Sequence, residues 1–111
     1  MVRVSMGLGS LAIAEPRRED RDEIHYRATA FGPDARQVSL LIVNISPHGL
    51  MARCDLDYDV GQRLRVNLPI VGVAIAEVRW SLGGRVGCQF GRMIEVAPYL
   101  EMLGELVKGA R

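Results

Sequence analysis

Two short polar motifs in the first half of the chain contain the residues best suited to bind a ligand. The first, residues 17–21, has the form Arg-x-x-x-Arg, and the second, residues 44–49, has the form Asn-x-Ser-x-x-Gly. A guanidinium group can donate two parallel hydrogen bonds to phosphate oxygens or to the adjacent O6 and N7 acceptors of guanine. An asparagine amide both donates and accepts, so it can pair with a guanine edge. Residues of these types can therefore bind phosphate groups and the polar edges of bases. The candidate binding residues are Arg17, Arg18, Arg21, Asn44, Ser46 and Gly49.

Each motif taken alone has a simpler structural interpretation. The charged run at 15–23 is typical of a solvated linker, and the segment at 44–49 is ordinary turn chemistry. Short patterns of this kind also occur by chance. Their order and spacing make a more specific signal, because the 22 residues between Arg21 and Asn44 suffice for two strands and a turn.

The motif pair resembles the signature of the PilZ domain, the bacterial receptor module for cyclic di-GMP. The resemblance implies a six-stranded antiparallel β-barrel followed by a C-terminal helix. It also implies that Arg17 and Arg21, with Arg18 beside them, clamp cyclic di-GMP from a linker that is mobile without the ligand. Asn44, Ser46 and Gly49 would then lie opposite, at the barrel rim. No cofactor is expected besides this ligand.

The hydropathy pattern agrees with an all-β domain of this kind. Residues 1–14 are expected to be a tail, and residues 15–111 a single domain with a linker at 15–23, a barrel at 24–92 and a helix at 96–108. Apolar residues alternate with polar ones along most of the barrel, and they follow helical spacing near the C-terminus. The strands are expected at residues 24–30, 38–45, 50–53, 64–68, 73–80 and 85–92.

Several residues carry individual expectations. Cys88 alternates with apolar neighbours and is expected in the core, and Trp80 is assigned to the core as well. Gly49 is expected where the backbone turns with positive φ or approaches the ligand closely. The strand at 38–45 is apolar on both faces, which predicts cover by a helix or a partner chain and leaves room for a homodimer. The acidic side chains near the Arg motif should weaken binding of a phosphate; they are Glu15, Glu19, Asp20, Asp22 and Glu23.

Composition excludes several classes of protein. Apolar residues make up 49% of the 111 residues, which indicates a globular domain. A net charge of +1 gives no field that favours nucleic acid or a membrane surface. No apolar run is long enough for a membrane span, and glycines interrupt the apolar stretch at 4–14 that mimics a signal peptide. Two cysteines without metal-like spacing favour a reduced, cytoplasmic protein.

No catalytic or metal site is predicted. The acidic loop at 55–59 lacks the Gly and Glu that a calcium loop needs, and His25 and His48 lack further ligands at suitable spacing. No nucleophile–base–acid set is visible. The main hypothesis is therefore a receptor for cyclic di-GMP that is not an enzyme and signals through an unidentified effector protein.

Two alternatives stay open. One is a PilZ-like interaction module that does not bind the nucleotide; the intact Arg motif argues against it, and the acidic residues around that motif argue mildly for it. The other is a small barrel that binds single-stranded nucleic acid. The low net charge and an aromatic content of 5% argue against the second, because such proteins need a basic groove and stacking aromatics.

Overall fold

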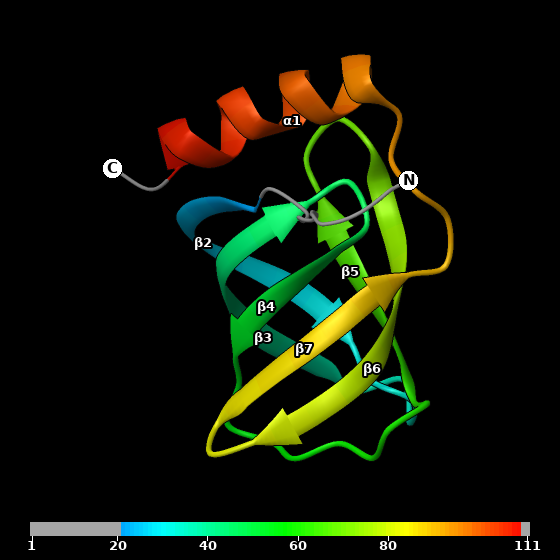
Figure 1. The fold of residues 1–111 in the computed structure, drawn as a ribbon. Helices are drawn as coiled ribbons and strands as arrows, with labels where there is room; N and C mark the ends of the chain where they lie inside the picture. The colour runs from blue at the N-terminus through cyan, green and yellow to red at the C-terminus, as the bar shows by residue number, and fades with distance from the viewer. Residues whose placement is uncertain (1–20, 110–111) are drawn as a thin grey trace, which may run out of the picture.

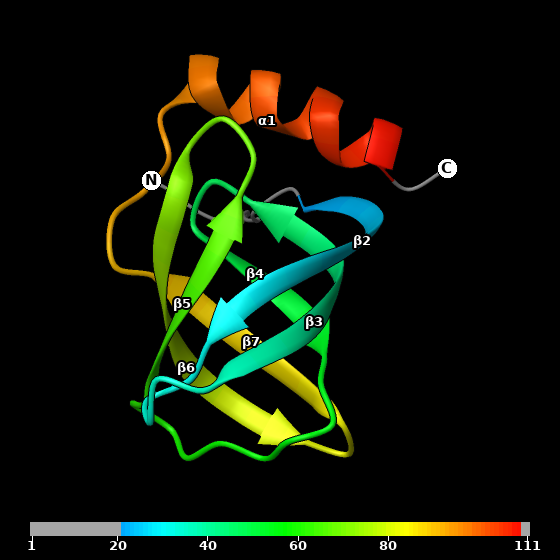
Figure 2. The ribbon, with the colours of Figure 1, turned by 180° about the vertical axis from the view of Figure 1, so that it is seen from behind.

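The structure, a computed structural model, describes residues 21–109 (Figure 1). The expected tail at 1–14 and the candidates Arg17 and Arg18 lie outside this range. Six antiparallel strands close into a barrel in the order β2-β3-β4-β7-β6-β5, and one helix lies across an end of it (Figures 1 and 2). The elements are β2 (Asp22–Phe31), β3 (Gln37–Ser46), β4 (Gly49–Arg53), β5 (Arg63–Leu68), β6 (Gly72–Leu82), β7 (Arg85–Phe90) and α1 (Val96–Gly109).

The predicted fold class is confirmed, and the strand ends differ from the expected ones by a few residues. The largest consequence is at the N-terminus of the barrel, where β2 begins at Asp22 and not at Ile24. Asp22 pairs with Ile45, and Glu23 pairs with Asn44. The end of the expected linker is therefore already part of the sheet, next to the second motif.

The interior of the barrel follows the alternation in the sequence. Leu64, Val66 and Leu68 of β5 point inward, as do the alternate residues of β7, including Cys88. Cys88 is 5% exposed, which confirms its prediction as a core residue. Burial raises the pKa of the Cys88 thiol to about 12, so the thiol stays protonated and unreactive at neutral pH.

A β-bulge in β3 decides which of its side chains reach the outer surface. Between Ile42 and Asn44 the register with β4 shifts by one residue, which makes Val43 the extra residue. Because side chains alternate along a strand, such a shift sends the following residues to the opposite face. Ile45 therefore enters the core with 0% exposure. Asn44 and Ser46, which simple alternation would place inside, face the outer side of the barrel wall.

The same bulge explains part of the apolar pattern on both faces of this strand. Ile45 belongs to the core, while Leu41 and Val43 are half-buried on the outer side. The expected cover over the second face is thus partial, and a homodimer remains a prediction.

A second bulge makes the prediction for Trp80 wrong. Trp80 is 42% exposed and lies outside the core. The register between β6 and β7 shifts between Val78 and Trp80, so that Arg79 is the extra residue. Val78 stays inside with 0% exposure, whereas both Arg79 and Trp80 lie on the outer face. Alternation extrapolated from Val78 would have turned Trp80 inward.

Helix α1 closes one end of the barrel with a single apolar face. Its buried residues Tyr99, Met102 and Leu106 recur at helical spacing and join the barrel core. Pro98 lies in the first turn, where a missing backbone N–H costs no intrahelical hydrogen bond. No helix within residues 21–109 is long and apolar enough to cross a membrane.

Candidate functional site

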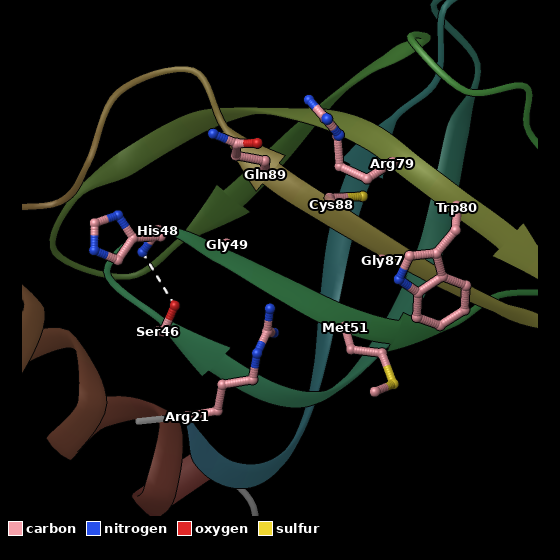
Figure 3. Close-up of a pocket in the computed structure, with 10 residues that line it drawn as sticks. All are labelled: Arg21, Ser46, His48, Gly49, Met51, Arg79, Trp80, Gly87, Cys88 and Gln89. Atoms are coloured by element: carbon pink, nitrogen blue, oxygen red, sulfur yellow. Dashed lines mark hydrogen bonds between the residues drawn. The ribbon is translucent and has the colours of Figure 1, made fainter. Parts of the chain in front are cut away.

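A cavity of about 410 Å³ lies on the outside of the barrel wall, beside the end of β3 (Figure 3). Its lining comes from the residue before β2, the end of β3, the β3–β4 turn, β4, β6 and β7. The two bulges shape it, because they bring Ser46 and Trp80 to the outer face, where Arg79 also lies. The lining residues are Arg21, Ser46, His48, Gly49, Met51, Arg79, Trp80, Gly87, Cys88 and Gln89.

Arg21 connects the two sequence motifs. Arg21 immediately precedes β2, and its side chain extends toward β4, between Ser46 and Met51 (Figure 3). Its Nη1 donates a hydrogen bond of 2.9 Å to Oδ1 of Asn44. The remaining guanidinium N–H groups are directed at the cavity, where they can donate to an oxyanion or a purine edge.

Ser46 holds the turn that forms one edge of the cavity. Its Oγ accepts a hydrogen bond of 3.1 Å from the backbone N–H of His48. Only 1% of Ser46 is exposed, so this turn-forming bond is well shielded from water. The carbonyl of His48 in turn accepts from the N–H of Phe90, which ties the turn to the end of β7. His48 itself is exposed and lines the cavity, so it is available to a ligand.

Gly49 is needed for close packing of two strands and not for a special backbone angle. Its φ is not positive, so that part of the prediction is wrong. The close approach is to β7: a Cβ atom at position 49 would lie 2.2 Å from the carbonyl oxygen of Cys88. This contact is with backbone, which cannot rotate away as a side chain can. Gly49 therefore sets the distance between β4 and β7 beneath the cavity.

Replacing Gly49 with alanine is expected to destabilise the fold. The added methyl group must push β4 and β7 apart, and overpacking of this kind costs about 1–3 kcal/mol in the free energy of unfolding. Urea denaturation followed by circular dichroism measures the change. Gly104→Ala is the matched control, because a Cβ there meets nothing within 4 Å and the helix gains propensity. Equal stability of Gly49→Ala and wild type would contradict the close-packing role.

Sequence reasoning missed the half of the site that β6 and β7 contribute. Trp80 lies flat on its cross-strand partner Gly87, where a Cβ would be 2.1 Å from Nε1 of the indole. Arg79 and Gln89 present a guanidinium and an amide on the same surface (Figure 3). No local pattern marks these residues as site residues; the one available signal is a tryptophan in a strand that is followed by a strand containing a glycine.

The cavity is electropositive. Arg21 and Arg79 both line it, and within the described part of the chain no carboxylate does. Asp22, one of the acidic residues expected to weaken binding, is held elsewhere, because the hydroxyl of Tyr99 donates to its Oδ2 at 2.5 Å. Glu23 is exposed and lies outside the lining.

The structure thus brings together the described members of both motifs. Arg21, Ser46 and Gly49 line one cavity, and Asn44 contacts Arg21. Arg17 and Arg18 lie outside the described residues. Residues 21–109 hold no group of three or more His, Cys, Asp or Glu side chains placed to bind a metal ion.

Comparison with protein families agrees with the geometry. A family model described as PilZ domain matches residues 15–109, which include both motifs and all seven elements. The chain belongs to the PilZ domain family. PilZ domains are a known family of cyclic di-GMP receptors, and they act by binding and not typically by catalysis. A comparison with curated proteins finds no match for this PilZ domain.

Proposed function

We propose that this PilZ domain binds cyclic di-GMP in the cavity beside β3 and relays binding to an effector protein in the cytoplasm. The observation that carries the proposal is the hydrogen bond between Arg21 and Asn44, which joins the two motifs at an electropositive cavity. The cavity volume of about 410 Å³ is within the range of small-molecule sites.

The lining offers a complementary group for each part of the ligand. Arg21 and Arg79 supply guanidinium forks for phosphate oxygens or for O6 and N7 of guanine. The hydroxyl of Ser46 accepts from His48 and keeps its own proton to donate. The exposed indole of Trp80 offers a flat face on which a purine can stack. The amide of Gln89 can pair with a guanine edge.

The N-terminal part of the Arg motif completes the proposed site. Arg17 and Arg18 fold over the bound ligand from the side opposite Ser46 and Gly49. This ordering step changes the surface next to the cavity, which an effector can read. The domain therefore acts as an adaptor, with the ligand controlling a protein–protein contact.

The test is titration calorimetry with cyclic di-GMP, with cyclic di-AMP as the matched ligand. Adenine carries an amino donor where guanine has the O6 acceptor, so an arginine fork cannot form on it. Saturable heat is expected from cyclic di-GMP at micromolar concentrations, and much less from cyclic di-AMP. Absence of heat from both ligands would overturn the proposal in favour of an interaction module that does not bind the nucleotide.

A further inference from the structure

One side chain of the C-terminal helix reaches the junction between the two motifs. The hydroxyl of Tyr99 lies 2.5 Å from Oδ2 of Asp22 and 3.1 Å from the backbone oxygen of Ile45. Asp22 directly follows Arg21 in the chain. Ile45 stands between Asn44 and Ser46. A single hydroxyl group from α1 thus contacts two residues that are adjacent in sequence to the candidate site residues Arg21, Asn44 and Ser46.

The surroundings of Tyr99 make this contact well defined. Tyr99 is 4% exposed, so its hydroxyl has lost most of its access to water. A buried hydroxyl needs a protein partner, and one that donates to a carboxylate is stronger than a neutral pair. Burial, together with the hydrogen bond to Asp22, raises the pKa of Tyr99, so the group remains a donor across the physiological range.

The contact bears directly on where Arg21 points. Asp22 and Ile45 are cross-strand partners at the first rung of the β2–β3 ladder. A rung at the end of a ladder frays easily unless something outside the pair holds it. Tyr99 holds it from the helix side, and the backbone of Arg21 is attached to this rung. Its guanidinium can then make the 2.9 Å bond to Asn44.

We propose that Tyr99 is a positioning residue for the ligand site, holding the Asp22–Ile45 rung so that Arg21 is aimed at Asn44 and the cavity. Its effect on ligand affinity rests on the proposed function, whereas its effect on Arg21 does not. Coupling free energies between two sites are reciprocal. A ligand that stabilises the position of Arg21 therefore also stabilises the packing of α1 on the barrel. The helix is thereby coupled to the ligand site.

The first experiment is a double-mutant cycle on the affinity for cyclic di-GMP. Tyr99→Phe removes the hydroxyl and keeps the ring in the core. We expect it to weaken binding by about three- to tenfold, the value of one net hydrogen bond. In an Arg21→Ala background it should have no further effect, because the group that it positions is gone. Equal weakening in both backgrounds, or none in either, would overturn the proposal.

The matched control is Tyr58→Phe. Tyr58 also has a buried hydroxyl. It belongs to the connection between β4 and β5. This connection runs at the end of the barrel away from α1 (Figure 1). Removal of the Tyr58 hydroxyl should leave the affinity for cyclic di-GMP unchanged. A general effect of removing a buried hydroxyl would appear in both variants and would count against positioning by Tyr99.

A second measurement needs no ligand and so separates this inference from the proposed function. The side-chain amide signals of Asn44 in an NMR spectrum report the bond from Arg21. They should shift in Tyr99→Phe and stay in place in Tyr58→Phe. Unshifted Asn44 signals in Tyr99→Phe would overturn the positioning role, whether or not wild type binds cyclic di-GMP. If Tyr99→Phe fails to fold, Asp22→Ala removes the other partner of the bond and is read in the same way.

Discussion

Replacing Arg21 with alanine is expected to weaken binding of cyclic di-GMP by about 10- to 100-fold, which corresponds to the loss of hydrogen bonds to a charged group. Among the described residues, Arg21 is the member of the first motif that lines the cavity, and it forms a 2.9 Å hydrogen bond with Asn44 of the second motif. Its removal takes away a ligand donor and also frees Asn44 to move. Titration calorimetry on the two proteins measures the change.

The matched control for this variant is Arg27→Ala. Arg27 is an exposed arginine in β2, it bonds to Ser39, and it lies outside the cavity. Both substitutions remove one positive charge, so both change the long-range field by the same amount. Only Arg21→Ala should lose affinity, and thermal unfolding should be little altered in either. Equal affinities for the two variants would show that the ligand binds elsewhere, or that its affinity depends only on the net charge of the domain.

Replacing Met102 with alanine is expected to lower the free energy of unfolding by about 2–5 kcal/mol, as large-to-small changes in a core do. Met102 has 0% exposure and lies on the face of α1 that closes the barrel. The truncated side chain leaves a cavity between the helix and the strands. Since α1 seals one end of the barrel, the loss should lower the stability of the whole domain. Urea denaturation measures the change, with an unchanged slope expected.

Leu100→Ala provides the comparison for the helix. Leu100 lies two residues away on the same helix and is 59% exposed. It also loses a large apolar side chain to alanine, but it leaves no cavity behind, so its effect should stay within about 0.5 kcal/mol. If both variants lost the same stability, α1 would be contributing through helix formation and not through packing on the barrel.

Much of the fold was predictable because neighbouring side chains on a strand point in opposite directions. The inward residues of β5 and β7 and the barrel-facing residues of α1 were all identified from local spacing. Cys88 was placed in the core for the same reason. Turn residues such as Gly83 and Gly84, both with positive φ, marked the hairpin between β6 and β7. Such signals lie within a few residues of one another, so one strand or turn at a time can be assigned.

The candidate site was predictable only in part. The motifs identified Arg21 and Asn44 only as ligand residues on opposite sides of the site, whereas the structure shows a direct hydrogen bond between them. Gly49 was expected to have a positive φ or to approach the ligand; its φ is not positive, and the constraint that the structure shows is the carbonyl of Cys88 on a strand distant in sequence. The residues that β6 and β7 add to the cavity carry no motif.

The sequence by itself thus determined the strand pattern, the single helix and the two motifs, because each depends on local spacing. Only the tertiary structure decided which face several of these side chains occupy. One extra residue in β3 turns Asn44 and Ser46 outward, and one in β6 does the same for Trp80, because a shift by one residue reverses an alternating pattern. The contact of Tyr99 with Asp22 spans 77 residues, and it exists only because α1 folds back over the start of the barrel.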